Sequence, residues 1–351
     1  MEIYCKSLSC KPIRIPTNEK HTIHLKTRSC VRRLGMTEVN FHHDSVVLLP
    51  DDVSAAEENK YSGLKALAAC FIYSNENIDQ SLMIVGHTDR SGPEAYNEIL
   101  SEKRARNVFY ALTGKRSEWT DSCLEKHNVE DYQYILKWLS NNRNWNTDPG
   151  DVDNINGPKT KAGVTRFQEQ YNTEYNKVIL CDGIVGKQTW GAFYDVYLSV
   201  LGELLGIQSE ELKSRQGMFT FLDPAVIGCG ERFPGTSDGT GDSTTDRRVE
   251  LLFFETGEEP EKNDVSICEQ LYSRNYYQFE PINCPMQSLK NTDKVTVRDE
   301  ADVMLAHTRI ACTLDDGSEV IVRTDSFGNA RVWGKTIASI TVDDVHTLDT
   351  I

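Results

Sequence analysis

The sequence lacks the features that mark several common protein classes. Its 351 residues contain no run near the ~18 apolar residues of a membrane helix, so no spanning segment is expected. No lysine and arginine cluster offsets the net charge of −15, which argues against a nucleic-acid-binding surface. The first thirty residues carry six basic side chains and no apolar block, so we expect no ordinary secretory signal.

Paired cysteines and catalytic motifs are also missing. The ten cysteines are scattered and form no C-x-x-C pair, so we expect most to be reduced, buried thiols. A disulfide such as Cys268 to Cys284 stays an open alternative after export. There is no H-E-x-x-H, G-x-S-x-G or catalytic Cys/His context. His42 and His43 are adjacent on an expected strand and would point to opposite faces. We therefore expect no enzymatic activity, no metal and no cofactor.

The most informative feature present is the segment 86–105, which reads GHTDRSGPEAYNEILSEKRA. The apolar run 82–85 before it predicts a buried strand, and apolar residues at helical spacing over 94–112 predict a helix. Asp89 lies in the turn between them, and Arg104 follows fifteen residues later. The simplest alternative is a solvated helix with a helical salt bridge. The pair can instead grip both ends of a zwitterion, since arginine binds a carboxylate through two parallel hydrogen bonds.

This segment resembles the signature of OmpA-like peptidoglycan-binding domains, T-D-x-x-G-x-x-x-Y-N-x-x-L-S-x-x-R-A. The matching positions are Thr88, Asp89, Gly92, Tyr96, Asn97, Leu100, Ser101, Arg104 and Ala105. The resemblance implies binding to meso-diaminopimelate of the Gram-negative stem peptide, with Asp89 accepting its ammonium and Arg104 clamping its carboxylate. It also implies contributions from Thr88, Asn97 and Arg248. Arg247 ranks lower, because alternation on a regular strand turns it to the other face.

Flanking segments extend the resemblance. Residues 41–51 look like the family's first strand and the turn into a first helix over 55–73. Residues 228–234 and 245–254 look like the loop after the third strand and the last strand, whose apolar run 251–254 suits a strand buried on both faces. About a hundred residues separate the second helix from the third strand, where the family usually has a short connection.

The intervening segment resembles a three-helix peptidoglycan-binding domain built on D-G-x-x-G-P-x-T. Residues 153–160 and 181–190 carry this pattern, with Asn154 in place of the first glycine. We expect the turn to survive because asparagine tolerates left-handed backbone, and we expect Thr160 and Thr189 to cap the following helices. Helices are expected over 132–138 and 196–205. Candidate ligand residues are Asp182, Gly183, Thr189 and Trp190; a spacer that has lost binding is the alternative.

The remaining sequence completes the expected domain organisation. Strands at 295–297, 308–314, 319–324 and 330–332, with an Asp-Gly turn between two of them, resemble an immunoglobulin-like or prealbumin-like sandwich. We expect an N-terminal β cap (1–38), a split OmpA-like domain (39–115 and 206–257), an inserted helical module (116–205), a linker (258–290) and the sandwich (291–351). The fold class is α+β, with a mixed four-stranded βαβαββ sheet and helices on one face.

The predicted function is non-catalytic binding to peptidoglycan. The wall polymer is itself anionic, so recognition by this acidic chain has to be local and geometric. Segments 228–234 and 247–254, with the insertion, resemble OmpA-like proteins of type VI secretion, which implies a spike-associated cargo, adaptor or effector and a spike or tip protein as partner. The alternative is a wall-degrading or other toxic effector that uses the OmpA-like domain for targeting. The expected location is the periplasm or cell wall, reached without a signal peptide.

Overall fold

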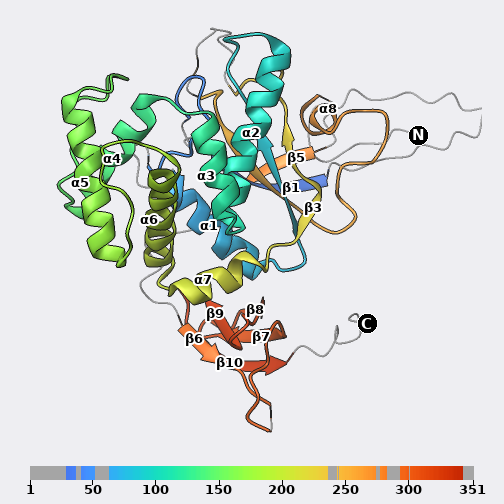
Figure 1. The fold of residues 1–351 in the computed structure, drawn as a ribbon. Coiled ribbons are helices and arrows are strands. Elements are labelled where there is room, and N and C mark those ends of the chain that lie inside the picture. Colours follow the sequence, from blue (N-terminus) through green and yellow to red (C-terminus); the bar gives the residue numbers. More distant parts are fainter. Residues whose placement is uncertain are drawn as a thin grey trace, which may run out of the picture.

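A mixed sheet forms the centre of the fold (Figure 1). The computed structural model describes residues 29–36, 41–51, 63–235, 243, 245–273, 277–282, 293–299 and 301–342. The five strands lie in the order β3 (Phe221–Gly228), β2 (Ser81–Gly86), β4 (Val249–Phe254), β1 (Ser29–Met36), β5 (Tyr277–Pro281). β4 runs antiparallel to β2 and β1, whereas the β2–β3 and β1–β5 pairs are parallel. The expected α+β class is confirmed.

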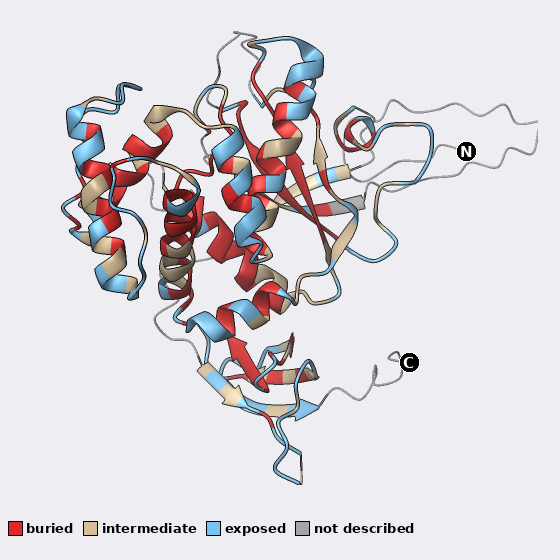
Figure 2. Cartoon of the chain, in the orientation of Figure 1, coloured by how far each residue is buried: buried red, intermediate tan, exposed pale blue. Residues whose placement is uncertain are grey.

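Both faces of this sheet are buried, as Figure 2 shows for its central strands. Alternate side chains such as Ile84, Leu251 and Phe253 pack on one face with α1 (Gly63–Glu76) and α2 (Glu94–Leu112). On the other face, Leu252 and Phe254 belong to a separate cluster with α8 (Ile267–Tyr272). The prediction of helices on one face was therefore wrong. An apolar run in a central strand points to both sides and needs cover on each.

The first strand is not where the sequence placed it. β1 comes from 29–36, which we had assigned to a cap, and it pairs with β4 and β5 inside the sheet. Residues 41–49 form no strand, although Val46 and Leu48 are fully buried. Their amides bond to the helical layer instead: Val46 N to Lys126 O, and Leu48 N to Asn107 Oδ1. A run of apolar residues predicts that a segment is buried, but it does not by itself show that the segment pairs with another strand. Of the helix expected over 55–73, only the part from residue 63 is described.

The segment expected as a linker is also structured. Residues 258–290 contain α8 and β5, and β5 extends the sheet beside β1. The acidic, proline-containing start of this segment suggested a linker. The later part, β5, is a strand because it pairs with β1, some 250 positions away in the sequence. Cys30, for example, lies opposite Gln278. Local sequence does not carry that information.

The inserted module packs as part of the main core. It comprises α3 (Arg116–Glu125), α4 (Val129–Arg143), α5 (Pro158–Tyr175) and α6 (Lys187–Leu205), followed by α7 (Ser209–Gln216). The expected helix over 196–205 is the second half of the continuous α6. Trp119 packs on Trp190 with ring centroids 6.1 Å apart, and both side chains are fully buried. They belong to the same apolar cluster as Ile84 and Phe253 of the sheet, so the insertion shares one core with it.

Short antiparallel strands form the C-terminal part. β7 (Arg309–Leu314), β8 (Glu319–Arg323) and β10 (Ile337–Val342) make one sheet, and β6 (Asp293–Thr296) pairs with β9 (Asn329–Val332). The two sheets share an apolar core that includes Ile310, Val322 and Val332. The strands expected at 308–314, 319–324 and 330–332 agree with β7, β8 and β9. Within the described ranges, none of the helices combines the length and apolar character that crossing a bilayer requires.

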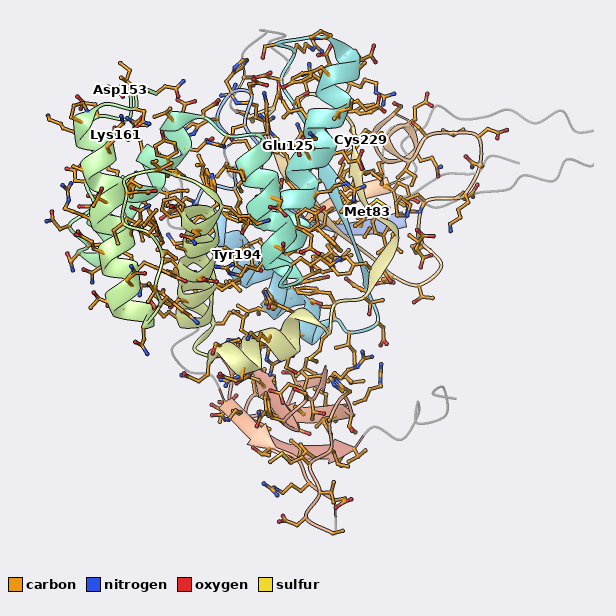
Figure 3. All side chains as sticks on the ribbon, in the orientation of Figure 1. Met83, Glu125, Asp153, Lys161, Tyr194 and Cys229 are labelled. Carbon is orange, nitrogen blue, oxygen red and sulfur yellow. A yellow bond between two sulfur atoms is a disulfide. The ribbon has the colours of Figure 1, made fainter. Side chains whose placement is uncertain are left out.

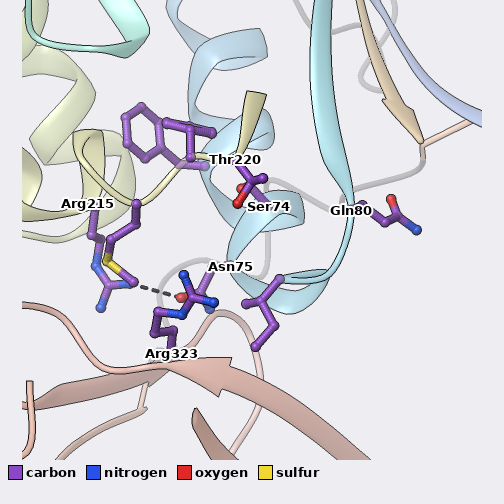
Figure 4. Close-up of a pocket in the computed structure, with 10 residues that line it drawn as sticks. Ser74, Asn75, Gln80, Arg215, Thr220 and Arg323 are labelled. Atoms are coloured by element: carbon purple, nitrogen blue, oxygen red, sulfur yellow. Dashed lines mark hydrogen bonds between the residues drawn. The ribbon is translucent and has the colours of Figure 1, made fainter. Parts of the chain in front are cut away.

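A buried ionic cluster fixes these sheets to the rest of the molecule. Glu211 of α7 accepts two hydrogen bonds from Arg331 of β9, both at 2.9 Å, and pairs with Arg215 at 3.0 Å. Arg215 in turn donates to Asn75 Oδ1 at 2.9 Å, as Figure 4 shows. Arg323 of β8 lines the same small pocket as Asn75 and Arg215 (Figure 4). α1, α7 and the C-terminal sheets are therefore held together by buried hydrogen bonds and ion pairs centred on Glu211 and Arg215.

One disulfide joins Cys229, at the end of β3, to Cys268 of α8 (Figure 3). The pairing of Cys268 with Cys284 was therefore wrong, and Cys284 lies outside the described residues. Among the cysteines described as free, Cys70, Cys123 and Cys312 are buried and Cys181 is exposed. Burial raises the pKa of the Cys70 thiol well above its ordinary value, so this thiol stays protonated.

Removing the disulfide should destabilise the fold, since it closes a loop with a sequence separation of 39. For the variant Cys229→Ala/Cys268→Ala we expect a loss of about 2–4 kcal/mol from the greater entropy of the unfolded chain. The measurement is urea unfolding under oxidising conditions. Cys181→Ala, which removes an exposed free thiol, is the matched control and should leave the midpoint unchanged. Equal midpoints for all three proteins would contradict the pairing.

Candidate functional site

The turn between β2 and α2 is held tightly by neighbouring elements. His87 N donates to Arg248 O at 2.8 Å, and Thr88 N donates to Gly230 O at 3.0 Å. Gly86 lies so close to α2 that a Cβ there would be 1.9 Å from Ser101 O, and Gly92 has a φ of +115°. Both positions therefore require glycine. These contacts fix the backbone of Asp89, the residue that follows Thr88.

Asp89 and Arg104 line the same open pocket, which has a volume of about 440 Å³. Its other lining residues come from the start of α2 and from the loop 41–51, and are His43, Asp44, Ser91, Gly92, Pro93, Tyr96 and Leu100. The turn and the helix thus bring the two predicted charges to one cavity. The structure places the pair as the spacing in the sequence predicts.

Arg104 is fully buried and held by backbone oxygens. Its Nε donates to Ser45 O at 2.9 Å, and its Nη2 donates to His42 O at 3.1 Å. The guanidinium lies over the Phe41 ring, 5.2 Å from the centroid. Nη1 has no hydrogen-bond partner among the described residues. Burial, together with the nearby Arg247, lowers the pKa of Arg104 to about 9. A buried cation with an unused donor is suited to bind an anion.

Asp89 is paired with Arg247. Its Oδ2 accepts a hydrogen bond from Arg247 Nη1 at 2.5 Å, and its Oδ1 accepts one from Ser91 N at 3.2 Å. Burial alone would raise the pKa of Asp89, but the hydrogen bonds from Ser91 and Arg247 outweigh it and hold the pKa below its ordinary value of 3.8. The Asp89 carboxylate and the Arg104 guanidinium thus line one pocket, but each is hydrogen-bonded to other groups and not to the other.

The prediction that Arg248 flanks the pocket was wrong. Neither Arg248 nor Arg247 is among the lining residues, but Arg247, which the sequence ranked lower, pairs with Asp89. Arg248 donates from Nε to Glu250 Oε1 at 2.8 Å and from Nη2 to Phe233 O at 3.1 Å, away from the pocket-lining residues. Arg247 reaches Asp89 because β4 begins only at Val249. Residues 246–248 form the turn before the strand, where the alternation of side chains does not apply.

Asn97 and Thr88 lie behind the pocket and do not line it. Asn97 is buried, and its Nδ2 donates to Glu231 Oε2 at 2.5 Å and to Asp89 O at 3.3 Å, so it fixes the turn. Thr88 is buried as well, and its hydroxyl lacks a partner among the described residues. Asp44 was missed as a lining residue. It accepts hydrogen bonds from Lys126, at 2.6 Å, and from the Tyr96 hydroxyl. In the sequence, the match of Tyr96 to the OmpA-like motif was the signal that could have pointed to this side of the pocket.

The histidines have structural partners. His42 Nδ1 lies 2.7 Å from Asp131 Oδ1, and His87 Nε2 lies 3.2 Å from the Tyr272 hydroxyl. Burial and the charge of Arg248 lower the pKa of His87 to about 3, so this ring is neutral at neutral pH. Among the described residues, no group of His, Cys, Asp and Glu side chains is arranged to hold a metal ion.

The two repeated turns of the inserted module are each fixed by one glutamine. Gln168 Nε2 donates to Asp182 Oδ1, Ile184 O and Thr189 Oγ1 at 3.0–3.1 Å, and Gln168 Oε1 accepts from Gly183 N. Gln133 makes the corresponding bonds to Asp153, Ile155 and Thr160. Asn154 has a φ of +61°, which confirms that asparagine takes the left-handed position.

These contacts change the roles expected for the module's candidate residues. The helix N-caps are Gly157 and Gly186, so the capping role given to Thr160 and Thr189 was wrong. The two threonines lie inside the first turns, and each donates to the carbonyl of the isoleucine five residues before it. Trp190 is fully buried in the core. The structure thus places Asp182, Gly183, Thr189 and Trp190 in the turn and the core of the module.

Known proteins resemble the chain in these same regions. Residues 51–154 match the OmpA family, and residues 125–193 match a family described as "Putative peptidoglycan binding domain". A stretch of 100 residues, 28% of this chain, is 33% identical to Outer membrane protein A of Shigella flexneri and to that of Citrobacter freundii. The match covers 24% and 35% of those two proteins, so the likeness is to one part of each. The chain contains an OmpA-type domain and a peptidoglycan-binding-type module, and the two support peptidoglycan binding.

The pairing of Asp89 with Arg247 predicts a change in its titration. In Arg247→Gln the charged partner is lost while burial remains, so the pKa of Asp89 should rise. Its carboxylate would then be lost at a higher pH as the solution is acidified. The measurement is the carboxyl ¹³C shift of Asp89 against pH. Arg248→Gln, which removes the neighbouring partner of Glu250, is the control and should shift this titration less. The reverse order would contradict the placement.

Proposed function

We propose that this protein binds peptidoglycan non-covalently by holding the free amino-acid end of a diaminopimelate side chain in the pocket of Asp89 and Arg104. The observation that carries the proposal is the guanidinium of Arg104, which is fully buried, lines the pocket and has an unused donor at Nη1. A carboxylate placed there would satisfy this donor and neutralise the buried charge. Both effects favour binding.

The second end of the ligand is an ammonium group on the same carbon as that carboxylate. Asp89 lines the same pocket, is ionised at neutral pH, and would accept the ammonium beside its existing pair with Arg247. Requiring both charges at one spacing gives selectivity that the overall charge of the chain cannot give, since the net charge of −15 repels an anionic wall. A pocket of this size and chemistry corresponds to affinities of about 1 μM to 1 mM.

The same contacts favour binding over catalysis. The pocket carboxylates are engaged with cations, Asp89 with Arg247 and Asp44 with Lys126. Glu231, the further carboxylate near the turn, accepts a hydrogen bond from Asn97. Hydrogen bonds that include those from the paired cations hold the pKa of Asp89 and of Asp44 below the ordinary value, whereas a general acid at neutral pH needs a raised pKa. We therefore propose a binding role without enzymatic activity, exerted at the cell wall.

Association with a type VI secretion spike stays a prediction from the sequence resemblance. So does the alternative of a wall-degrading or toxic effector. The C-terminal sheets are the part of the chain that a spike or tip protein would contact under the first of these predictions. They are joined to the sheet domain through Glu211 and Arg331.

Co-sedimentation with purified sacculi tests the proposed function. Arg104→Lys keeps a buried positive charge but loses the planar fork, and Asp89→Asn removes the negative pole. Each should weaken binding by about 30-fold or more, the equivalent of roughly 2 kcal/mol. Arg106→Ala, on the exposed side of the same helix, is the matched control and should bind normally. Free meso-diaminopimelate should compete with wild-type binding.

A second wall preparation makes the test selective. Peptidoglycan with lysine in place of diaminopimelate has the side-chain ammonium but lacks the neighbouring carboxylate, so it offers nothing to Arg104 Nη1. We expect binding to be weaker than to the diaminopimelate type by a similar factor. Equal binding of both walls, or full binding by Arg104→Lys, would refute the role of this pocket.

A further inference from the structure

A second pocket lies on the outer face of α4, away from Asp89 and Arg104. It has a volume of about 590 Å³. Four of its lining side chains, Tyr134, Lys137, Trp138 and Asn141, follow one another at the spacing that places residues on one side of a helix. Asp151 and Asp51 complete the polar rim. This volume falls within the range of small-molecule sites, about 300–1,000 Å³.

The core takes one side chain of this face, Trp138, which joins Ile135, Leu136 and Leu139 in the main apolar cluster. The others are not core residues: Tyr134 and Lys137 are half-buried, and Asn141 is exposed. The pocket face instead combines two aromatic rings with an amide, a cation and a carboxylate. Polar residues on an exposed helix face are explained by solubility alone. A cavity lined by such residues is not, so the cavity needs another explanation.

The side chains of this face are already fixed in place. The Tyr134 hydroxyl donates to Asp51 O at 2.6 Å, and Lys137 Nζ donates to Gly150 O at 3.0 Å. The Trp138 ring packs edge-on against Tyr197, with centroids 6.3 Å apart, and retains only 9% of its exposure. Little side-chain entropy would therefore be lost when a ligand binds.

We propose that this pocket binds the glycan strand of peptidoglycan through its N-acetylated amino sugars. A pyranose ring has an apolar C–H face, which packs on aromatic side chains, and a rim of hydroxyl and acetamido groups. Asn141 offers both a donor and an acceptor to that rim, and Asp151 accepts from hydroxyls. Lys137 can donate to the lactyl carbonyl oxygen of muramic acid, which is an amide carbonyl where a stem peptide is attached. The inference rests on the proposed function, because it names a second part of the same polymer.

The loop 41–51 connects the two pockets. His43 and Asp44 line the first pocket, and Asp51 lines the second. Seven residues separate Asp44 from Asp51, so their Cα atoms lie within about 25 Å of each other. Diaminopimelate is the third residue of the stem peptide, and three extended residues span about 10 Å from the sugar. The sugar and the stem peptide that occupy the two pockets need not belong to one wall fragment, because the polymer presents both groups repeatedly.

α4 also supports the first pocket directly. Asp131, in its first turn, contacts His42 at 2.7 Å and accepts a hydrogen bond from Ser45 Oγ at 2.8 Å. The carbonyls of these same two residues hold Arg104. One helix thus orients the loop that positions the guanidinium and carries the face that lines the glycan pocket. Binding at two linked sites would raise the overall affinity without new contacts at either.

The test uses peptide-free glycan strands, prepared from sacculi with an amidase and labelled for fluorescence anisotropy. We expect the full chain to bind them, and Asn141→Ala/Asp151→Ala to bind at least tenfold more weakly with an unchanged melting temperature. Asn146→Ala is the matched control, an exposed asparagine of the same module outside the pocket, and should bind like wild type.

These outcomes separate the two proposals. Failure of the wild-type chain to bind glycan strands would overturn the inference, even if sacculus binding depends on Arg104. An equal loss in Asn146→Ala would overturn the placement of the site. A released stem peptide that binds through Asn141 and Asp151, in place of the strands, would overturn the choice of ligand. If Arg104→Lys binds sacculi as well as the wild type, the proposed diaminopimelate pocket would be refuted, and the glycan pocket would not.

Discussion

The site depends on how one buried arginine is held. Arg104 contributes two of its nitrogen atoms to the carbonyls of Ser45 and His42, and its Nη1 has no hydrogen-bond partner among the described residues. Backbone oxygens can hold a guanidinium without neutralising it, because they carry no net charge. A carboxylate in their place would have satisfied the cation and left no reason to bind an anion. The surrounding structure therefore positions the charge through backbone carbonyls and not through a carboxylate.

This requirement explains why the inserted helices matter to a site they do not line. The loop that supplies those carbonyls is not a strand and has no ladder to hold it. Its amides and side chains are fixed by Lys126 and Asp131 at α3 and α4, and by the Tyr197 hydroxyl of α6, which donates to Leu48 O. The insertion and the sheet share one apolar core, so the loop is held between two parts of a single packed unit. The module is structurally part of the pocket's support.

Local patterns predicted the parts of the structure that local contacts determine. The Asp89 turn, α2, the β7–β8 hairpin and the left-handed Asn154 all follow from short-range sequence signals. What failed depended on distant pairing. The sheet position of β1, the addition of β5 and the contact of Arg247 with Asp89 are set by neighbours far away in sequence. The stripe of Tyr134, Trp138 and Asn141 was visible in the sequence at helical spacing. Packing decides which of these side chains the core takes: Trp138 joins the main apolar cluster, whereas Asn141 is exposed.

The bond between Cys229 and Cys268 ties part of this architecture to its chemical surroundings. Protein disulfides persist in oxidising compartments and are rare where thiols are kept reduced. A chain still in reducing surroundings would have α8 attached to its sheet face by non-covalent contacts alone, such as the packing of Leu271 and the hydrogen bond from the Tyr272 hydroxyl to Glu250. The same chain beside an oxidising cell wall would have that face locked covalently. How firmly α8 is attached to this face of the sheet therefore depends on the redox conditions around the molecule.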